Sequence, residues 1–519
     1  MIFNFFSARA ARSPHPLADA KELKRLIGGL PLDNAFDALD QVSAWLKSLQ
    51  QADGWALGRF FDVLHQIDEA AQPHLQRLAR EYLNSSRVSK NEEGRLWTSN
   101  HGYWVQVANL YAQCIERFIS RPNDKGSAAL KASLPLVSAR LVAALAAQLK
   151  WLAYRYSPAK PELWADLGRA YLVADALGYA EIPLRLYADR STESSVRQQY
   201  LHALVREASS IDCLTPLEIE LADRVSEYFL PGFVFSAESR SDSVYWVDAA
   251  RGFPPVRLAR QPLEISASMR FFSPGTAAQT LDELIAALGR GEMPDGLNLG
   301  RAAAPKQLLP VLRHLARYWA AHPPLREHPR HPVKNRCAVR HGFKNCHAAL
   351  AGADGVPGDP AAAEQAEAES WLVENVSFGG FGAEVDCARS DWPKLGALLC
   401  LQPDGGQNWV LAVVRRYGRR SETQARVGIQ SLSRQATSIE LHVHNARARA
   451  LAVSGFPCIW LGESGAAGEA RIALPANRFD LQQELVFSHD HQRTVLTPIV
   501  LEESGSDYQI GRYYERIDG

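Results

Sequence analysis

At 519 residues the chain is long enough for three or four domains, each with a hydrophobic core of its own. Its 57 Lys and Arg residues balance its 57 Asp and Glu residues. This balance argues against a dedicated polyanion-binding protein, because such proteins carry a basic excess. The seven cysteines are scattered, odd in number and without a Cys-x2-Cys pair, so neither a disulfide framework nor a zinc ribbon is indicated.

The ends of the chain and its hydropathy predict a cytoplasmic protein. Residues 1–6 are apolar but too short for the hydrophobic region of a signal peptide, and no basic residues precede them. No run reaches the 18 or more apolar residues of a membrane-spanning helix. We therefore expect no transmembrane segment.

The first 230 residues are predicted to form an all-helical domain. Apolar residues recur at helical spacing over 34–49, 60–83 and 103–119, and the Ala- and Leu-rich segment 130–156 is typical of a helix buried on most sides. Two further helices are expected over 162–177 and 194–208. The pattern predicts a helical bundle or a solenoid in domain 1–230.

One segment of this domain resembles the start of a tetratricopeptide repeat. Trp164, Leu167, Gly168 and Tyr171, with Ala180 further on, stand at the steps of that motif. A solenoid needs about three repeats and only one is in register, so a simple helix pair explains the pattern equally well. Either way, we expect the helical domain to bind a protein partner.

The period of the apolar residues changes at Leu230. Short β-branched and aromatic runs follow, separated by Ser, Asp, Gly and Pro, and helices are expected over 277–288 and 305–321. Residues 231–325 are therefore predicted to be a small α+β companion domain, to which we assign no ligand chemistry.

Two arginines and a glycine-rich turn dominate the next segment. Arg336 and Arg340 stand four residues apart after a Pro-rich linker, and an Arg fork satisfies both acceptors on the Hoogsteen edge of guanine. Downstream, Asn375 and Ser377 alternate onto one face of a predicted strand. The glycines at 379 and 380 are expected to turn the backbone with positive φ and to let a ligand approach.

The ordered pair Arg-x3-Arg and Asn-x-Ser-x2-Gly resembles the signature of the PilZ domain, a six-stranded β-barrel that binds cyclic di-GMP. The alternating segments 409–416 and 426–430 are similar to strands of that barrel. The resemblance covers about residues 330–435. It implies that Arg336 and Arg340 clamp the phosphates and guanine edges, that Asn375 and Ser377 hydrogen-bond guanine or phosphate, and that Gly380 leaves room for the base.

Accessory residues and an insertion are also expected in this segment. The candidate accessory residues are Lys334, Asn335, Arg415 and Arg416. Residues 351–369 are rich in Ala, Gly, Pro and Glu, and we interpret them as a loop inserted between the first two strands of the barrel. Arg326, Arg330 and Lys334 form a basic cluster in the linker that attracts an anionic ligand.

After the barrel, residues 437–519 alternate as strands with no helix expected beyond residue 436. They predict a C-terminal β extension or a second small barrel. The fold class is therefore multidomain α+β, with domains at 1–230, 231–325, 326–436 and 437–519.

The sequence contains two histidine pairs but no enzyme motif. His442 and His444, and His489 with His491, could share a strand face, but no third ligand has a clear spacing, so no metal site is predicted. No P-loop, G-x-S-x-G, H-E-x2-H or dinucleotide-binding fingerprint is present. We expect no catalytic residues, no enzyme activity and no cofactor.

The sequence thus favours a bacterial cyclic di-GMP receptor in second-messenger signalling that regulates biofilm formation or motility. We expect ligand binding to order the linker, to rearrange the domains and to signal to a protein partner, without DNA binding. Two other classes stay open. One is a protein-interaction scaffold whose barrel has lost its ligand, and the other is an RNA-binding protein, because β-barrels with Arg and aromatic faces bind single strands.

Overall fold

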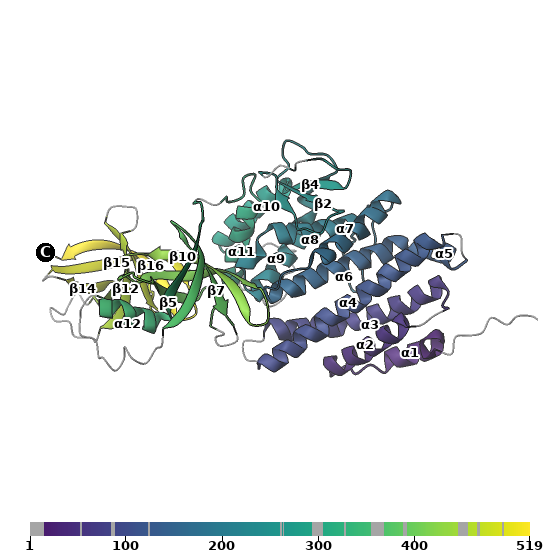
Figure 1. The fold of residues 1–519 in the computed structure, drawn as a ribbon, viewed down its shortest axis with the longest axis horizontal. Helices are drawn as coiled ribbons and strands as arrows, with labels where there is room; N and C mark the ends of the chain where they lie inside the picture. Colours follow the sequence, from purple (N-terminus) through teal and green to yellow (C-terminus); the bar gives the residue numbers. More distant parts are fainter. Residues whose placement is uncertain are drawn as a thin grey trace, which may run out of the picture. The chain divides into compact units, whose positions relative to one another are not determined.

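The computed structural model describes residues 15–51, 54–84, 89–122, 125–259, 262, 264–292, 305–325, 328–353, 368–387, 392–444, 455–463, 468–489 and 492–518. The chain divides into two compact units, Met1–Pro324 and Leu325–Gly519 (Figure 1).

The first unit is helical over most of its length, as predicted. Its helices are α1 (Ala20–Gly28), α2 (Ala35–Gln50), α3 (Leu57–Leu83), α4 (Lys90–Ser120), α5 (Lys125–Leu130), α6 (Leu134–Tyr154), α7 (Pro161–Ala176), α8 (Val196–Ala208) and α9 (Pro216–Phe229). Several begin at a polar residue whose side chain accepts from the first free backbone N–H groups. Thr215 and Glu218, for example, form a capping box at the start of α9.

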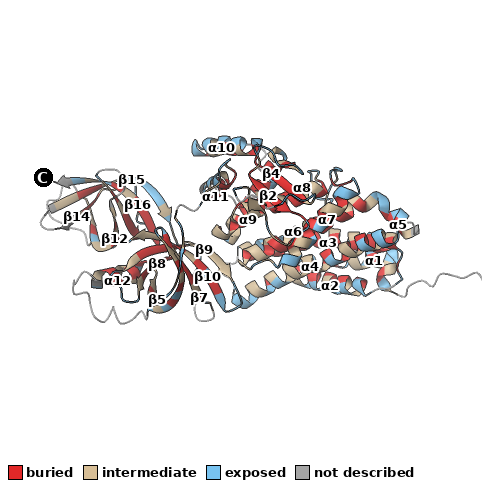
Figure 2. Ribbon diagram, turned by 45° about the horizontal axis from the view of Figure 1, so that its top comes forward, coloured by how far each residue is buried: buried red, intermediate tan, exposed pale blue. Residues whose placement is uncertain are grey.

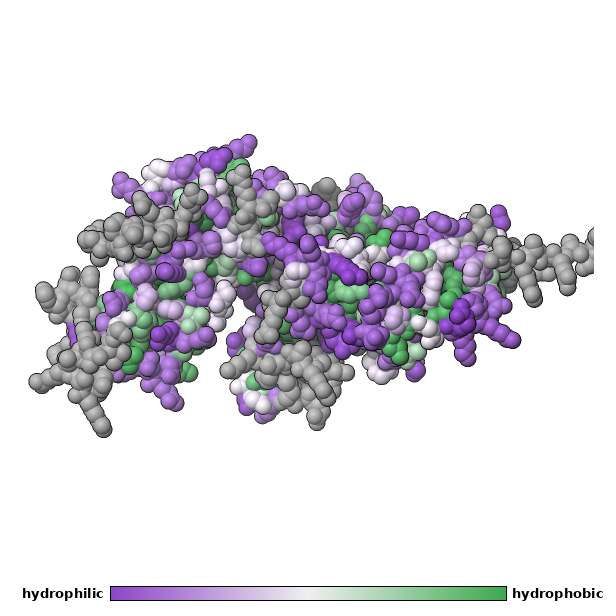
Figure 3. Space-filling view, turned by 90° about the horizontal axis from the view of Figure 1, so that it is seen from below, coloured by the Kyte–Doolittle hydropathy of each residue, from purple (hydrophilic) through white to green (hydrophobic). Residues whose placement is uncertain are grey.

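Helix α6 lies at the centre of this unit. The stretch Gly126–Tyr154 is long and apolar enough to cross a membrane by length and composition, but 67% of its apolar window is buried inside the protein (Figure 2). The described residues on the face seen in Figure 3 are mostly hydrophilic, with apolar residues in small separate areas. The apolar character of α6 is that of a core helix.

A buried polar network joins α3, α4 and α6. The Asp68 carboxylate accepts from the Tyr103 hydroxyl at 2.5 Å, the Tyr111 hydroxyl at 2.6 Å and Arg140 Nη1 at 3.0 Å. Asp68 is fully buried and Arg140 is 1% exposed. Since a buried charge is tolerated only when it is paired and hydrogen-bonded, these contacts are mutually dependent.

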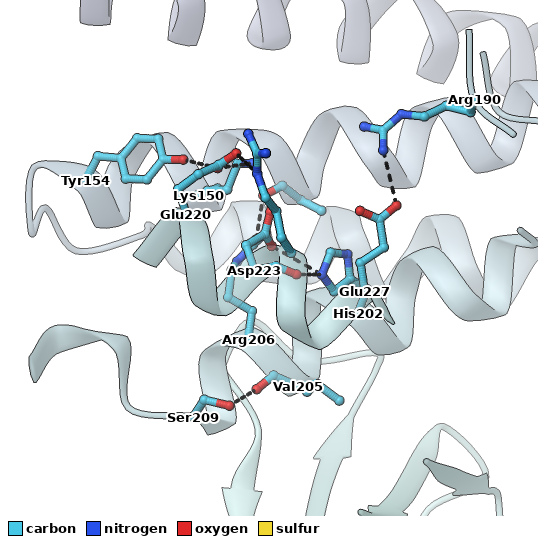
Figure 4. A network of polar contacts seen from close by, with 12 residues as sticks. Lys150, Tyr154, Arg190, His202, Val205, Arg206, Ser209, Glu220, Asp223 and Glu227 are labelled. Atoms are coloured by element: carbon cyan, nitrogen blue, oxygen red, sulfur yellow. Dashed lines mark hydrogen bonds and ion pairs between the residues drawn. The ribbon is translucent and has the colours of Figure 1, made fainter. Parts of the chain in front are cut away.

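A second network joins α6, α8 and α9 (Figure 4). Lys150 Nζ lies 2.9 Å from Asp223 Oδ2 and 3.1 Å from Glu220 Oε2, and Arg206 Nη1 donates to Asp223 Oδ1 at 3.0 Å. Burial by itself raises the pKa of the Asp223 carboxyl. The charges of Lys150, His202 and Arg206 outweigh it and hold that pKa well below its usual range.

The lowered pKa of Asp223 predicts an acid-dependent stability. The Asp223 carboxyl takes up its proton near pH 4 in the unfolded chain and at a lower pH in the folded protein. The stabilisation that its charge provides is therefore complete above about pH 4 and is lost as the pH falls below that value. Asp223→Asn should destabilise the protein by about 3 kcal/mol near pH 7, since Lys150 and Arg206 lose a buried partner. Urea unfolding at pH 7, 5, 4 and 3 should show the gap to wild type shrinking towards acid; a constant gap would contradict the role of Asp223.

The unit also contains a small antiparallel sheet in the order β1-β4-β2-β3. The strands are β1 (Val234–Ser236), β2 (Tyr245–Asp248), β3 (Val256–Arg257) and β4 (Met269–Ser273), followed by α10 (Thr276–Gly289) and α11 (Pro305–Tyr318). The domain boundary at residue 230 stays a prediction, but one hydrophobic core runs across it and includes Val225, Phe235, Phe272 and Trp319.

The repeat-like residues serve this core. Trp164, Leu167 and Tyr171 are buried on α7. A Cβ at Gly168 would lie 2.0 Å from the carbonyl oxygen of Ala249, so the glycine admits the backbone that follows β2. The pattern thus reflects helix-to-sheet packing at this position.

The second unit contains two closed barrels. The first confirms the barrel predicted from the sequence, and the second confirms the alternative of a small C-terminal barrel. The first barrel has the order β10-β7-β6-β5-β8-β9. Its strands are β5 (His331–His341), β6 (Glu369–Ser377), β7 (Gly380–Asp386), β8 (Leu398–Pro403), β9 (Val410–Arg419) and β10 (Gln424–Ser433). Inward side chains alternate with outward ones; on β10, Ala425, Val427 and Ile429 are buried.

Helix α12 (Phe343–Ala353) follows β5 and overlaps the expected loop at 351–369 only in residues 351–353. Gly342, with φ +82°, ends β5, and the Asp507 carboxylate accepts from the Phe343 N–H at 2.6 Å. Phe343, Cys346 and Leu350 lie on one face and are buried. The helical spacing of these three residues is the sequence signal for α12, a helix that we did not predict. Residues 354–367 of the expected loop lie outside the described part of the chain.

The second barrel has the order β11-β12-β13-β16-β15-β14. Its strands are β11 (Thr437–Val443), β12 (Phe456–Glu463), β13 (Glu469–Pro475), β14 (Leu485–His489), β15 (Gln492–Ser504) and β16 (Tyr508–Asp518). A hydrophobic cluster that includes Leu398 and Val413 of the first barrel and Ile459 and Ile510 of the second holds the two together.

Candidate functional site

The two motif stretches lie on neighbouring strands, but their register separates them. In the β5–β6 pair, Pro332 lies opposite Asn375 and Arg336 lies opposite Leu372. Arg340 is further along and pairs with Cys400 of β8. At about 3.3 Å per residue, Arg336 is on the order of 10 Å along the sheet from Asn375.

Each of the two predicted arginines has other neighbours. Arg336 is exposed, and its Nη1 donates to Ser370 Oγ at 3.2 Å. The Arg340 guanidinium lies 5.7 Å from the centre of the Trp409 ring. The structure therefore does not bring the Arg336–Arg340 pair to Asn375 and Ser377, in contrast to the sequence-based expectation.

Asn375 and Ser377 do share the outer face of the barrel. A bulge after Val373 shifts the register, so that Asn375 lies opposite Gly382 and Ser377 opposite Gly380, while Val376 between them packs on the core. The Asn375 side chain is 8% exposed, and its buried Oδ1 has no hydrogen-bond partner among the described residues. A buried acceptor of this kind requires an explanation, and a ligand N–H provides one.

Two glycines extend this outer face across β7 and β10. Gly382 lies opposite Gly428, which lies opposite the exposed Arg416 of β9. A Cβ at Gly382 would lie 2.7 Å from the Asn375 amide, and one at Gly428 would lie 3.1 Å from Arg416 Cβ. Small residues thus give space to the amide and to the arginine at either end of the row.

The other accessory candidates occupy different places. Lys334 and Asn335 are exposed at the irregular start of β5. Arg415 donates to Gln430 Oε1 at 2.7 Å and pairs with Glu503 of the second barrel at 2.5 Å. Of the four candidates, Arg416 is the one placed in the row with Asn375.

The two motif glycines have a different role from the expected one. Neither Gly379 nor Gly380 has positive φ, so the predicted left-handed turn is wrong. A Cβ at Gly380 would lie 1.9 Å from the carbonyl oxygen of Ile429. Gly380 therefore permits the close approach of β7 and β10, and the space above it is filled by backbone and not left open for a base.

The residues that do lie beside the motif hairpin come from the linker. The rings of His328 and Phe378 are 5.1 Å apart, and His331 pairs with Val376. The half-buried Arg330 stands between these two contacts in the chain. Arg330 follows Arg326 at the same Arg-x3-Arg spacing, which is the sequence signal that could have located this pair; Arg326 lies outside the described residues.

The histidine candidates do not form a metal site in the described part of the chain. His444 Nδ1 lies 3.0 Å from Glu484 Oε2. No group of three or more His, Cys, Asp or Glu residues is placed to hold a metal ion among the described residues. Asp490 and His491 lie outside them.

The first closed six-stranded barrel, which carries Asn-x-Ser-x2-Gly on its outer face, fits the resemblance to the PilZ domain. Residues 21–239 match the family model described as "Cyclic-di-GMP receptor FimW, N-terminal domain". No curated protein matches the chain. The family match covers the helical part and not the barrels, so it confirms the resemblance to cyclic di-GMP receptors from residues that do not carry the barrel motif.

Proposed function

We propose that this protein is a cyclic di-GMP receptor that binds its ligand on the outer face of the first barrel. The observation that carries the proposal is the match of residues 21–239 to a family whose description names this ligand. The Asn375–Ser377 face on a separate part of the chain supports it. The protein acts by binding in the cytoplasm, without catalysis and without a cofactor.

The chemistry of the face suits a cyclic guanine dinucleotide. Asn375 Oδ1 accepts from a guanine N–H, and the hydroxyl of Ser377 lies on the same face. We assign the arginine clamp to Arg330, because the linker residues on either side of it, and not Arg336 or Arg340, contact the motif hairpin. Arg326 joins it on the Arg-x3-Arg spacing of the sequence alone. Arg416, at the far end of the row, provides a further cation for a phosphate.

The position of Arg330 in the linker connects binding to signalling. The linker joins the helical unit to the barrels and contains Pro323, Pro324, Pro329 and Pro332. A ligand held by Arg330 and Ser377 orders this segment and so restricts how the two units are arranged, which a protein partner of the helical unit then detects. Limited proteolysis in the linker should slow at saturating ligand; unchanged cleavage would exclude this step.

Calorimetric titration with cyclic di-GMP, beside cyclic di-AMP and GMP, tests the receptor function. Micromolar or tighter binding is expected for cyclic di-GMP alone. Adenine in cyclic di-AMP lacks the second Hoogsteen acceptor for an arginine, and GMP offers one guanine where cyclic di-GMP offers two. No heat at protein concentrations well above the micromolar range would favour the scaffold alternative. Binding that weakens steeply with salt and does not distinguish the nucleotides would favour RNA.

A further inference from the structure

Phe378 is a large apolar side chain in an exposed position beside the motif. It is 72% exposed and belongs to the two-residue turn that joins β6 to β7, directly after Ser377. A single exposed aromatic residue needs no special explanation. This one is unusual because its surroundings hold it in place without covering it.

Residues from three segments of the chain contact the turn between β6 and β7 and stabilise it. Arg434 Nη2 donates to the Phe378 carbonyl oxygen at 2.8 Å, and the same guanidinium lies 5.0 Å from the centre of the Phe378 ring. The His328 ring approaches it edge-on at 5.1 Å. The Gly379 carbonyl accepts from the Ser431 N–H at 3.1 Å. The ring is thus preorganised, so a ligand that stacks on it loses little conformational entropy.

We propose that Phe378 is a base-stacking platform of the ligand face and that Arg434 is the cation beside it. The inference rests on the proposed function and adds two residues to it that lie outside the motif. A planar aromatic ring next to hydrogen-bonding groups recognises a base through stacking, which adds to affinity without reading the base edge. An adjacent guanidinium binds phosphate or extends the stack.

Arg434 also connects the ligand face to the segment that leads into the second barrel. It stands in the short connector between the end of β10 at Ser433 and the start of β11 at Thr437. A ligand that binds Phe378 or Arg434 replaces their contact with each other and therefore changes the contacts of the segment that joins the two barrels.

Titrations of four variants with cyclic di-GMP test the proposal. Phe378→Ala and Phe378→Leu should raise Kd at least about fivefold, because stacking is lost, whereas Phe378→Tyr should stay near wild type. Tyr514→Ala, a 51% exposed aromatic on the second barrel, is the matched control and should bind like wild type. Unfolding midpoints should be unchanged in all the Phe378 variants, since the side chain is exposed.

Arg434→Ala should also weaken the binding of cyclic di-GMP and reduce the salt dependence of Kd, because one cation near the phosphates is removed. Normal binding by Phe378→Ala would overturn the stacking role and leave the receptor function intact. Weak binding by both the Ala and Tyr variants together with lower unfolding midpoints would also overturn it, because the residue would then be structural. Absence of binding by the wild-type protein would overturn both proposals.

Discussion

Replacing Arg330 by Ala is expected to weaken cyclic di-GMP binding at least about 30-fold. Removing one partner of a paired charge contact costs about 2 kcal/mol or more, and each 1.4 kcal/mol is tenfold in Kd. Arg330 is half-buried and lies in the chain between His328, whose ring contacts Phe378, and His331, which pairs with Val376. Isothermal titration of the wild-type and variant proteins measures the change directly.

Arg336→Ala is the matched control, since it removes the same side chain from the neighbouring strand segment. Arg336 is exposed and bonded to Ser370, so Kd should stay within about threefold of wild type, in the range of exposed charge contacts. Arg340→Ala should behave in the same way, because that guanidinium lies against Trp409. If Arg336→Ala abolished binding and Arg330→Ala did not, the assignment from sequence spacing would hold and the one from strand register would fail.

Replacing Arg140 by Ala is expected to destabilise the helical unit by about 3–5 kcal/mol, because a fully buried carboxylate is left without its counter-charge. The two tyrosine hydroxyls still donate to Asp68, but they carry no charge to balance it. The variant also loses the Arg140 Nε bond to the Leu186 carbonyl at 3.0 Å. Urea unfolding followed by the helical circular dichroism signal measures the loss.

The control for Arg140 is Arg169→Ala on the surface of α7. Arg169 pairs with Asp166 at 2.7 Å, but the two side chains are 68% and 51% exposed. Exposed pairs contribute at most about 1 kcal/mol, so this variant should be close to wild type. A loss below about 1 kcal/mol for Arg140→Ala would show that the tyrosine hydroxyls alone satisfy Asp68.

Local patterns in the sequence were sufficient to predict the kinds of element and their order. The helical spacing of α2, α3 and α4, the change of period near residue 230 and the alternation of β9 and β10 all depend on neighbours a few residues apart. The outward pairing of Asn375 and Ser377 was predictable for the same reason, because alternation is a property of the strand itself.

Strand register and backbone approach were decided only by the tertiary structure. In the β5–β6 pair, Pro332 and not Arg336 lies opposite Asn375. A bulge in each strand changes which residues are paired, and spacing along the chain does not reveal this change. Gly380 is required by the Ile429 backbone of a strand about 50 residues away in the sequence, and α12 is stabilised by apolar partners from both barrels. The sequence alone thus determined that Asn375 and Ser377 share one strand face, whereas long-range pairing decided which segment of the chain lies beside them.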